Sequence, residues 1–192
     1  MRLKNIVFVL LASGSALVGR AEDTNVITLY TKLEAFENQV GKVIVKAYAL
    51  TGTITAKTAV ISVAFKESAD VASGQKEYGI SIGIKEENLA EYRIVIDYDE
   101  LDSFLDGIEY LSKVEVTVTS LPNFHAIYRT RADFRVLAFS TNRQPGTLQT
   151  AIQTAYQPAG GRILLPLEQL AEFKFLIREA KAKLDALKKA GP

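Results

Sequence analysis

Alternation of apolar with polar or small residues over much of the chain is the feature that most restricts its fold. In segment 77–85, "EYGISIGIK", Tyr78, Ile80, Ile82 and Ile84 occupy every second position, as in a strand that buries one face. Successive strands with short connections favour antiparallel pairing. Further strand-like segments are 42–50, 59–65, 92–96, 113–121, 124–130, 134–141, 148–156 and 160–165.

Two longer segments have helical spacing instead. Apolar residues recur every three or four positions after residue 97 and again after Pro166, and a shorter helix is predicted over 31–40, ending at Gly41. The apolar faces of these helices consist of Leu101, Phe104, Leu105, Ile108 and Leu111; of Leu170, Phe173, Ile177, Ala180, Leu184 and Leu187; and of Leu33, Phe36 and Val40.

Residues 92–108 resemble residues 161–177 at an offset of 69, which indicates an internal repeat. Each segment is a short strand that runs directly into a helix, preceded by several strands. We therefore expect a single α+β domain over residues 22–192, with repeat halves at about 42–112 and 113–190. The expected core is an antiparallel sheet of roughly eight to ten strands with two helices, and the alternative is a meandering β-barrel with a C-terminal helix. Identical pairs are Arg93/Arg162, Ile94/Ile163, Leu101/Leu170, Phe104/Phe173 and Ile108/Ile177.

The first 21 residues have the layout of a secretory signal peptide. Arg2 and Lys4 precede an apolar core at 6–18, and Gly-Arg-Ala at 19–21 fits a small-x-small cleavage site. The apolar core is shorter than the ~20 residues of a spanning helix. We expect cleavage after Ala21 and a secreted or periplasmic product with no membrane span; the alternatives are an uncleaved anchor or a buried first strand.

The charge balance after cleavage disfavours nucleic acid as a partner. Removal of residues 1–21 lowers the count of Lys and Arg from 23 to 20 against 22 Asp and Glu, so the net charge falls from +1 to −2. Phosphate backbones bind basic surfaces. The predicted order of elements resembles, by topology and without a shared motif, the two β4α halves of the Whirly-type single-strand-binding proteins. Fold does not determine activity, and both the charge and the export signal argue against that function.

Six carboxylates lie in segment 97–110. The segment fails the EF-hand pattern, because an EF-hand starting at Asp97 would place Leu101 at a ligand position and Asp102 at the invariant glycine. The spacing of Asp97 and Glu100, just before the apolar face of the helix, predicts a capping box.

The other acids of this segment fall together on the outer side of the predicted helix. At about 100° per residue, Asp99, Asp102, Asp106 and Glu109 lie opposite its apolar face. A solvated helix face is the favoured interpretation; the functional alternatives are an acidic surface for a basic partner or a weak Ca²⁺ site. An internal partner is also expected, on the flank of the terminal helix that carries Lys174, Arg178, Lys181 and Lys189.

Basic residues gather in the predicted hairpin 124–141. His125, Arg129 and Arg131 share one face of a period-two strand, and Arg135 can lie near them across the hairpin. An edge strand kept soluble by arginines is the favoured interpretation. The alternative is a ligand-binding patch for a carboxylate, a sulfated glycan or a phosphate group.

The residue inventory leaves few routes to catalysis. The chain has no cysteine and one histidine, which excludes thiol catalysis, thiolate metal sites and disulfides. No catalytic residue, metal site or cofactor is predicted, and an enzyme is the less favoured class. We expect an exported binding or interaction module of a bacterial cell envelope whose partner is a protein, a glycan or a small molecule. The alternatives are a carrier of a small apolar ligand and a hydrolase that uses carboxylates.

Overall fold

The computed structural model describes residues 31–140, 147–154 and 162–190. The protein is an α+β molecule with two antiparallel sheets and three α-helices among these residues. The elements of the first part are α1 (Lys32–Glu37), β1 (Ile44–Thr55), β2 (Ala59–Asp70), β3 (Lys76–Glu86), β4 (Tyr92–Asp97), a 3₁₀ turn at Tyr98–Glu100 and α2 (Leu101–Ser112). Those of the second part are a 3₁₀ turn at Val116–Val118, β5 (His125–Arg129), β6 (Phe134–Ser140), β7 (Leu148–Thr154), β8 (Ile163–Leu164) and α3 (Leu167–Ala190).

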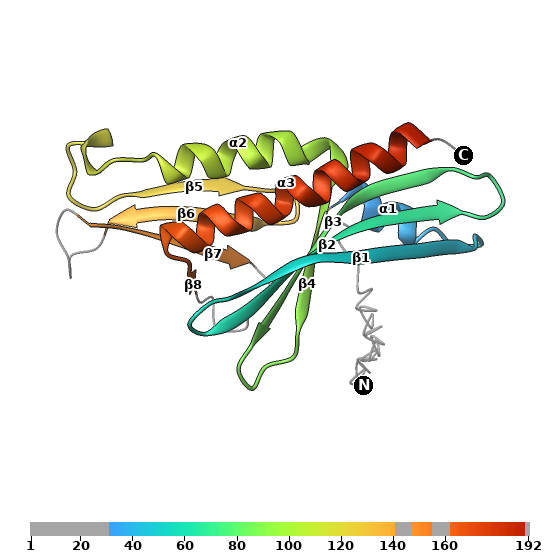
Figure 1. Ribbon diagram of the computed structural model, residues 1–192, viewed down its shortest axis with the longest axis horizontal. Helices are drawn as coiled ribbons and strands as arrows, with labels where there is room; N and C mark the ends of the chain where they lie inside the picture. Colours follow the sequence, from blue (N-terminus) through green and yellow to red (C-terminus); the bar gives the residue numbers. More distant parts are fainter. Residues whose placement is uncertain (1–30, 141–146, 155–161, 191–192) are drawn as a thin grey trace, which may run out of the picture.

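Each sheet has four strands in sequence order, β1-β2-β3-β4 and β5-β6-β7-β8 (Figure 1). In the first sheet Val63, Ile82 and Ile94 lie side by side on adjacent strands, so their side chains share the buried face. The eight described strands fall within the predicted eight to ten, but they form two open four-stranded sheets, so the prediction of a single sheet and the alternative of a barrel are both wrong. The third helix, α1, is the short helix predicted over 31–40, beside the two long helices of the expected core.

Each of the two long helices packs on the sheet formed by the other half of the chain. α2 follows β4 in the chain but packs on β5 and β6 of the second sheet. α3 follows β8 but packs mainly on β1, β2 and β3 of the first sheet, and Figure 1 shows it running from β7 across to β3. Each sheet is thus covered by the helix that belongs to the other half of the chain.

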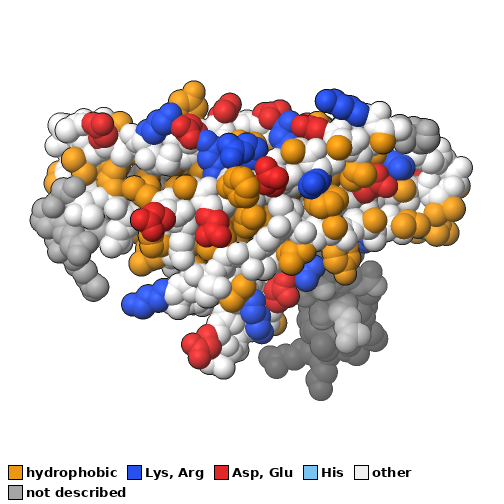
Figure 2. Space-filling view, viewed as in Figure 1, with side chains coloured by type: hydrophobic (Ala, Val, Ile, Leu, Met, Phe, Trp, Pro, Cys, Tyr) orange, Lys and Arg blue, Asp and Glu red, His pale blue; other side chains and the backbone are white. Residues whose placement is uncertain are grey.

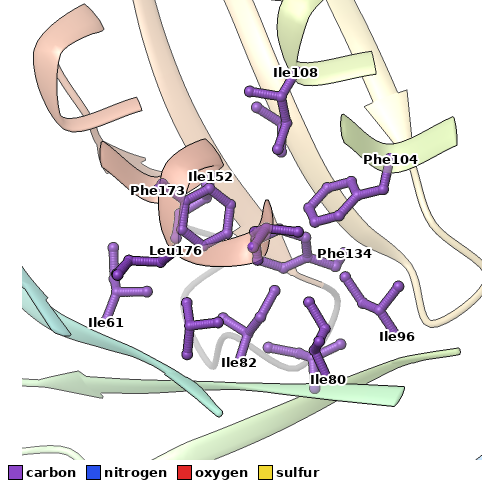
Figure 3. Close-up of a cluster of buried hydrophobic side chains, with 14 of the residues drawn as sticks. Ile61, Ile80, Ile82, Ile96, Phe104, Ile108, Phe134, Ile152, Phe173 and Leu176 are labelled. Carbon is purple, nitrogen blue, oxygen red and sulfur yellow. The ribbon is translucent and has the colours of Figure 1, made fainter. Parts of the chain in front are cut away.

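One core joins both sheets and both helices (Figure 3). Phe104 of α2, Phe134 of β6 and Phe173 of α3 are fully buried, and their ring centroids lie 6.0 to 6.3 Å apart. Such tilted and edge-to-face contacts stabilise by ~0.5–1.5 kcal/mol beyond the burial of area. Isoleucines of the first sheet, Ile61, Ile80, Ile82 and Ile96, form the floor under these rings (Figure 3).

Two local predictions fail. Segment 113–121 was expected to be a strand, but it is a 3₁₀ turn with flanking loop, in which Val116, Val118 and Leu121 are exposed. α1 ends at Glu37 and leaves Val40 in solvent, although Gly41 has the predicted positive φ of 79°. The dipeptide Pro145-Gly146, which is typical of a type II turn, lies outside the described residues. None of the described helices is both long enough and apolar enough to cross a membrane.

Candidate functional site

The predicted basic and acidic residues meet where β4 ends, beside the β5–β6 turn. Arg131 Nη1 lies 3.1 Å from Asp97 Oδ2 and 2.8 Å from Asp99 Oδ1. Lys32 Nζ of α1 lies 2.6 Å from Asp99 Oδ2. The hydrogen bond from Arg131 lowers the pKa of Asp99 to about 2, so this carboxylate stays ionised at neutral pH. These groups neutralise one another instead of facing a ligand.

Asp97 caps a helix other than the one predicted. Its side chain makes no capping hydrogen bond at the start of its own helical segment. Instead, its two carboxylate oxygens accept the backbone N–H groups of Lys32 (2.9 Å) and Leu33 (3.0 Å) in the first turn of α1. The predicted capping box is therefore wrong. Asp97 is only 2% exposed and holds α1 against the end of β4.

Glu100, the other member of the predicted box, is also buried. Its Oε1 accepts the backbone N–H of Arg131 at 2.9 Å, and its Oε2 has no hydrogen-bond partner. Burial raises the pKa of Glu100, because desolvation disfavours the charged carboxylate. This carboxyl joins α2 to the β5–β6 turn, and no pattern in the sequence could indicate a contact across 31 residues.

The other arginines of the hairpin are bound internally. Arg129 Nε and Arg135 Nε lie 2.5 and 2.8 Å from the same oxygen of Asp133. The His125 ring packs edge-on against Phe139, with the ring centroids 5.8 Å apart. β5 is an edge strand, as the favoured interpretation predicted. The structure brings Arg129 and Arg135 together on one aspartate, while Arg131 binds the acids at the end of β4.

The acidic face of α2 lies against the basic flank of α3, which confirms the predicted internal pairing. Lys174 of α3 forms an ion pair with Glu109, and Lys181 Nζ lies 3.4 Å from Asp102 Oδ1. Lys113 also pairs with Glu109 within α2. Asp106 is exposed. In the part of the chain that the structure describes, no group of three or more His, Asp or Glu side chains could hold a metal ion, so nothing supports the Ca²⁺ site.

A surface depression of about 300 Å³ lies next to the junction of Asp97 and Asp99. Lys188 Nζ of α3 lies 3.9 Å from the centroid of the Tyr98 ring, which forms part of its wall. The charges around the depression balance and select neither anions nor cations. Its charged lining residues are Lys32, Lys76 and Lys188 against Glu77, Asp97 and Asp99.

The outer edge of β1 is the most unusual surface of the molecule. β1 has 12 residues and forms the edge of its sheet, where it pairs with β2. Val45, Tyr48 and Leu50 are 53%, 68% and 62% exposed, and they point to both faces of the sheet. Figure 2 shows hydrophobic side chains gathered at the end of the molecule where β1 begins. A contiguous apolar surface of this kind marks an interaction site in soluble proteins.

The sequence alone did not single out this edge. The run "KVIVKAYAL" carries apolar residues on both faces, although Lys42 and Lys46 interrupt one of them. Such a run is more typical of a central strand that is covered on both sides. The structure places this run at an edge, and α3 leaves its first half uncovered because the helix crosses β1 near Gly52, against Leu176. The contrast between a central-strand composition and an edge position becomes visible only once the strand order is known.

Comparisons with known proteins found no match among family models, curated proteins or solved structures.

Proposed function

We propose that this protein is an exported interaction module that binds a partner protein through the outer edge of β1. The observation that carries this proposal is the exposed apolar character of an edge strand 12 residues long, in which Lys46 is the sole charged residue. An unpaired strand edge offers a row of N–H and C=O groups that can hydrogen-bond an added strand. The side chains on its two faces supply apolar contacts and specificity.

The other sheet edges support this choice by contrast. Proteins protect strand edges by shortness and by charged side chains. β5 has five residues and carries Arg129, β4 has six and carries Arg93, and β8 has two. Among the described edge strands, β1 is the longest and has one charged residue in twelve, so it is the edge on which partner binding is expected.

Two observations favour an interaction module over the alternatives. The core between the sheets is filled by Phe104, Phe134 and Phe173, whereas a carrier of an apolar ligand needs a cavity there. A hydrolase needs a carboxyl that can be protonated near the working pH. Asp99 has a pKa of about 2 and is bound to Arg131 and Lys32, which makes it unsuited to that role. Burial raises the pKa of Glu100, but this side chain is only 7% exposed and accepts the backbone N–H of Arg131, so it is not placed to reach a substrate.

We also propose that the two halves arose by duplication. Both have four strands followed by one helix, and the apolar residues that are identical in the sequence repeat are buried in both halves. Phe104 and Phe173, which correspond at the offset of 69, pack edge to face at 6.3 Å. A duplicated origin accounts for two similar units that share one core.

Export rests on the signal-like layout of residues 1–21. N-terminal sequencing of the protein from the producing cell would test it. We expect a mature chain that begins at Glu22, and a chain that retains Met1 in the cytosol would remove the export part of the proposal.

The interaction itself is tested by site-specific photo-crosslinking in the producing cell. A photoreactive phenylalanine analogue at position 48 reports on the β1 edge, and the same analogue at Ile127, an exposed residue of the β5 edge, is the matched control. We expect a discrete protein adduct from position 48 and little from position 127. Equal adducts from both, or none from position 48, would refute binding at β1.

A further inference from the structure

Residues 44–50 of β1 pair with β2 on one side and have no strand partner on the other side among the described residues. This segment has a self-complementary pattern. Residues 44–50 pair with β2 without a break, and the register shift follows between Leu50 and Gly52. Ala47 is the midpoint of this segment, and Lys46 is its one charge. In an antiparallel pair of two such segments with Ala47 opposite itself, Lys46 faces Tyr48, and Ile44 faces Leu50.

We infer that the partner bound at this edge is a second copy of the chain, which pairs β1 with β1 across a twofold axis at Ala47. The inference rests on the proposed function and names its partner. Pairing joins the β1–β4 sheets of the two copies into one continuous sheet of eight strands. The backbone N–H and C=O groups on the outer edges of the two β1 strands then bond to each other.

Charge and side-chain size fit this register. The two Lys46 ammonium groups do not face each other; each lies opposite a tyrosine ring, where its aliphatic stem can pack and its amine can stay in solvent. The amine is also held by Glu37 of its own chain at 3.2 Å. On the other face Val45 meets Ala49, so the two β-strands approach with no bulky side chain in the way.

Apolar groups on both sides of the strand extend the contact. A ladder of seven residues is about 24 Å long and by itself falls short of the ~800 Å² per partner of a standard interface. Val43 and Val71 are exposed together beside the start of β1, where the Val71 N–H donates to the Val43 carbonyl at 3.0 Å. Above Ala47 and Ala49, a depression of about 200 Å³ reaches Leu187 of α3. These surfaces can bury the additional area.

The assembly closes at two copies. A twofold contact uses the same surface on both chains and therefore consumes it. The edges that remain exposed are β4, β5 and β8, which are short or carry arginine. We therefore expect a discrete dimer and no growth into fibres.

The absence of cysteine from the chain allows a direct test of the register. The variant A47C places one thiol on the twofold axis, where opposed residues of an antiparallel pair have a Cα separation within disulfide range. Under mild oxidation we expect A47C to form a covalent dimer rapidly and the control I127C to form little. Equal rates for the two variants would overturn the inference.

A second measurement tests the interface without a crosslink. Light scattering coupled to size exclusion, over a wide range of concentration, should show the wild-type chain as a dimer. Y48K places a charge opposite Lys46 of the other copy and should weaken the dimer by about tenfold or more. Y110K changes an equally exposed tyrosine on α2 and should leave the dimer intact. Equal effects of the two substitutions would contradict pairing at β1.

The outcomes separate the inference from the proposed function. If the wild-type chain is monomeric at every concentration but is crosslinked from position 48 to a different protein, the inference of a dimer is refuted and the proposed binding at β1 stands. A monomer with no adduct from position 48 overturns both. A dimer that A47C traps and Y48K dissociates supports both.

Discussion

Asp97 connects parts of the chain that are far apart in the sequence. Its carboxylate accepts two backbone N–H groups of α1 and a hydrogen bond from Arg131 of the β5–β6 turn. Burial of such a carboxylate is tolerated only because all these partners are present. The residue is therefore structural, in contrast to the exposed Asp106 on the same acidic stretch.

The variant D97A should lower the free energy of unfolding by about 2–4 kcal/mol, because it leaves two N–H groups of α1 and the Arg131 guanidinium without this acceptor. Urea denaturation followed by circular dichroism measures the change. D106A, which removes an exposed acid, should stay within ~0.5 kcal/mol of the wild type. Similar effects of D97A and D106A would show that the Asp97 contacts contribute little.

Glu100 makes stability depend on pH in the direction opposite to that of a typical salt-bridged acid. Its pKa in the folded state is raised above the usual value of 4.5 by burial, so the folded protein binds this proton more tightly than the unfolded chain does. The protonated Glu100 side chain therefore stabilises the folded state fully below pH 4.5, and this stabilisation is lost as pH rises through the folded-state pKa.

In E100Q the side chain stays neutral and can still accept the Arg131 backbone N–H. We therefore expect E100Q to melt at a higher temperature than the wild type near neutral pH, and the difference to vanish below pH 4.5. Thermal melts at a series of pH values measure this. A difference that is constant with pH would assign the effect to something other than the charge.

At the scale of elements, α2 packs closely on β5 through Gly107. A Cβ at this position would overlap the ring of Tyr128. Helical spacing identified the apolar face of α2 correctly, because Leu101, Phe104 and Ile108 are all buried. The close approach at Gly107 was not predictable, because the sequence does not say which strand that helix covers.

G107A separates helix propensity from packing. Alanine is favoured over glycine inside a helix by roughly 0.5–1 kcal/mol, but the overlap with Tyr128 should reverse the sign and destabilise by ~1–3 kcal/mol. In a Y128A background the same substitution should become neutral or stabilising. Denaturant unfolding of the four proteins of this double-mutant cycle measures the coupling, and additive effects would contradict a direct contact.

At the scale of the whole molecule, the sequence predicted the local elements better than their assembly. Period-two segments such as 77–85 were predicted correctly as strands. Their buried side chains, such as Ile80 and Ile82, recur at every second position, so the pattern is visible within the segment itself. Segment 113–121 has the same alternation but no strand beside it, so Val118 and Leu121 remain exposed. The division into two sheets, the crossing of the helices and the edge position of β1 depend on contacts between distant segments, which periodicity does not encode.

The crossing of α2 and α3 makes each half of the chain dependent on the other. A fragment of residues 31–113 lacks the helix that covers β1, β2 and β3, and a fragment of residues 114–190 lacks the one that covers β5 and β6. We expect each fragment alone to show little cooperative unfolding, because its sheet would expose its apolar face. An equimolar mixture should regain helical and strand signal by circular dichroism and unfold cooperatively. Cooperative folding of either fragment alone would show that the halves are independent, and the shared core of Phe104 and Phe173 would then be an accessory contact between two stable units.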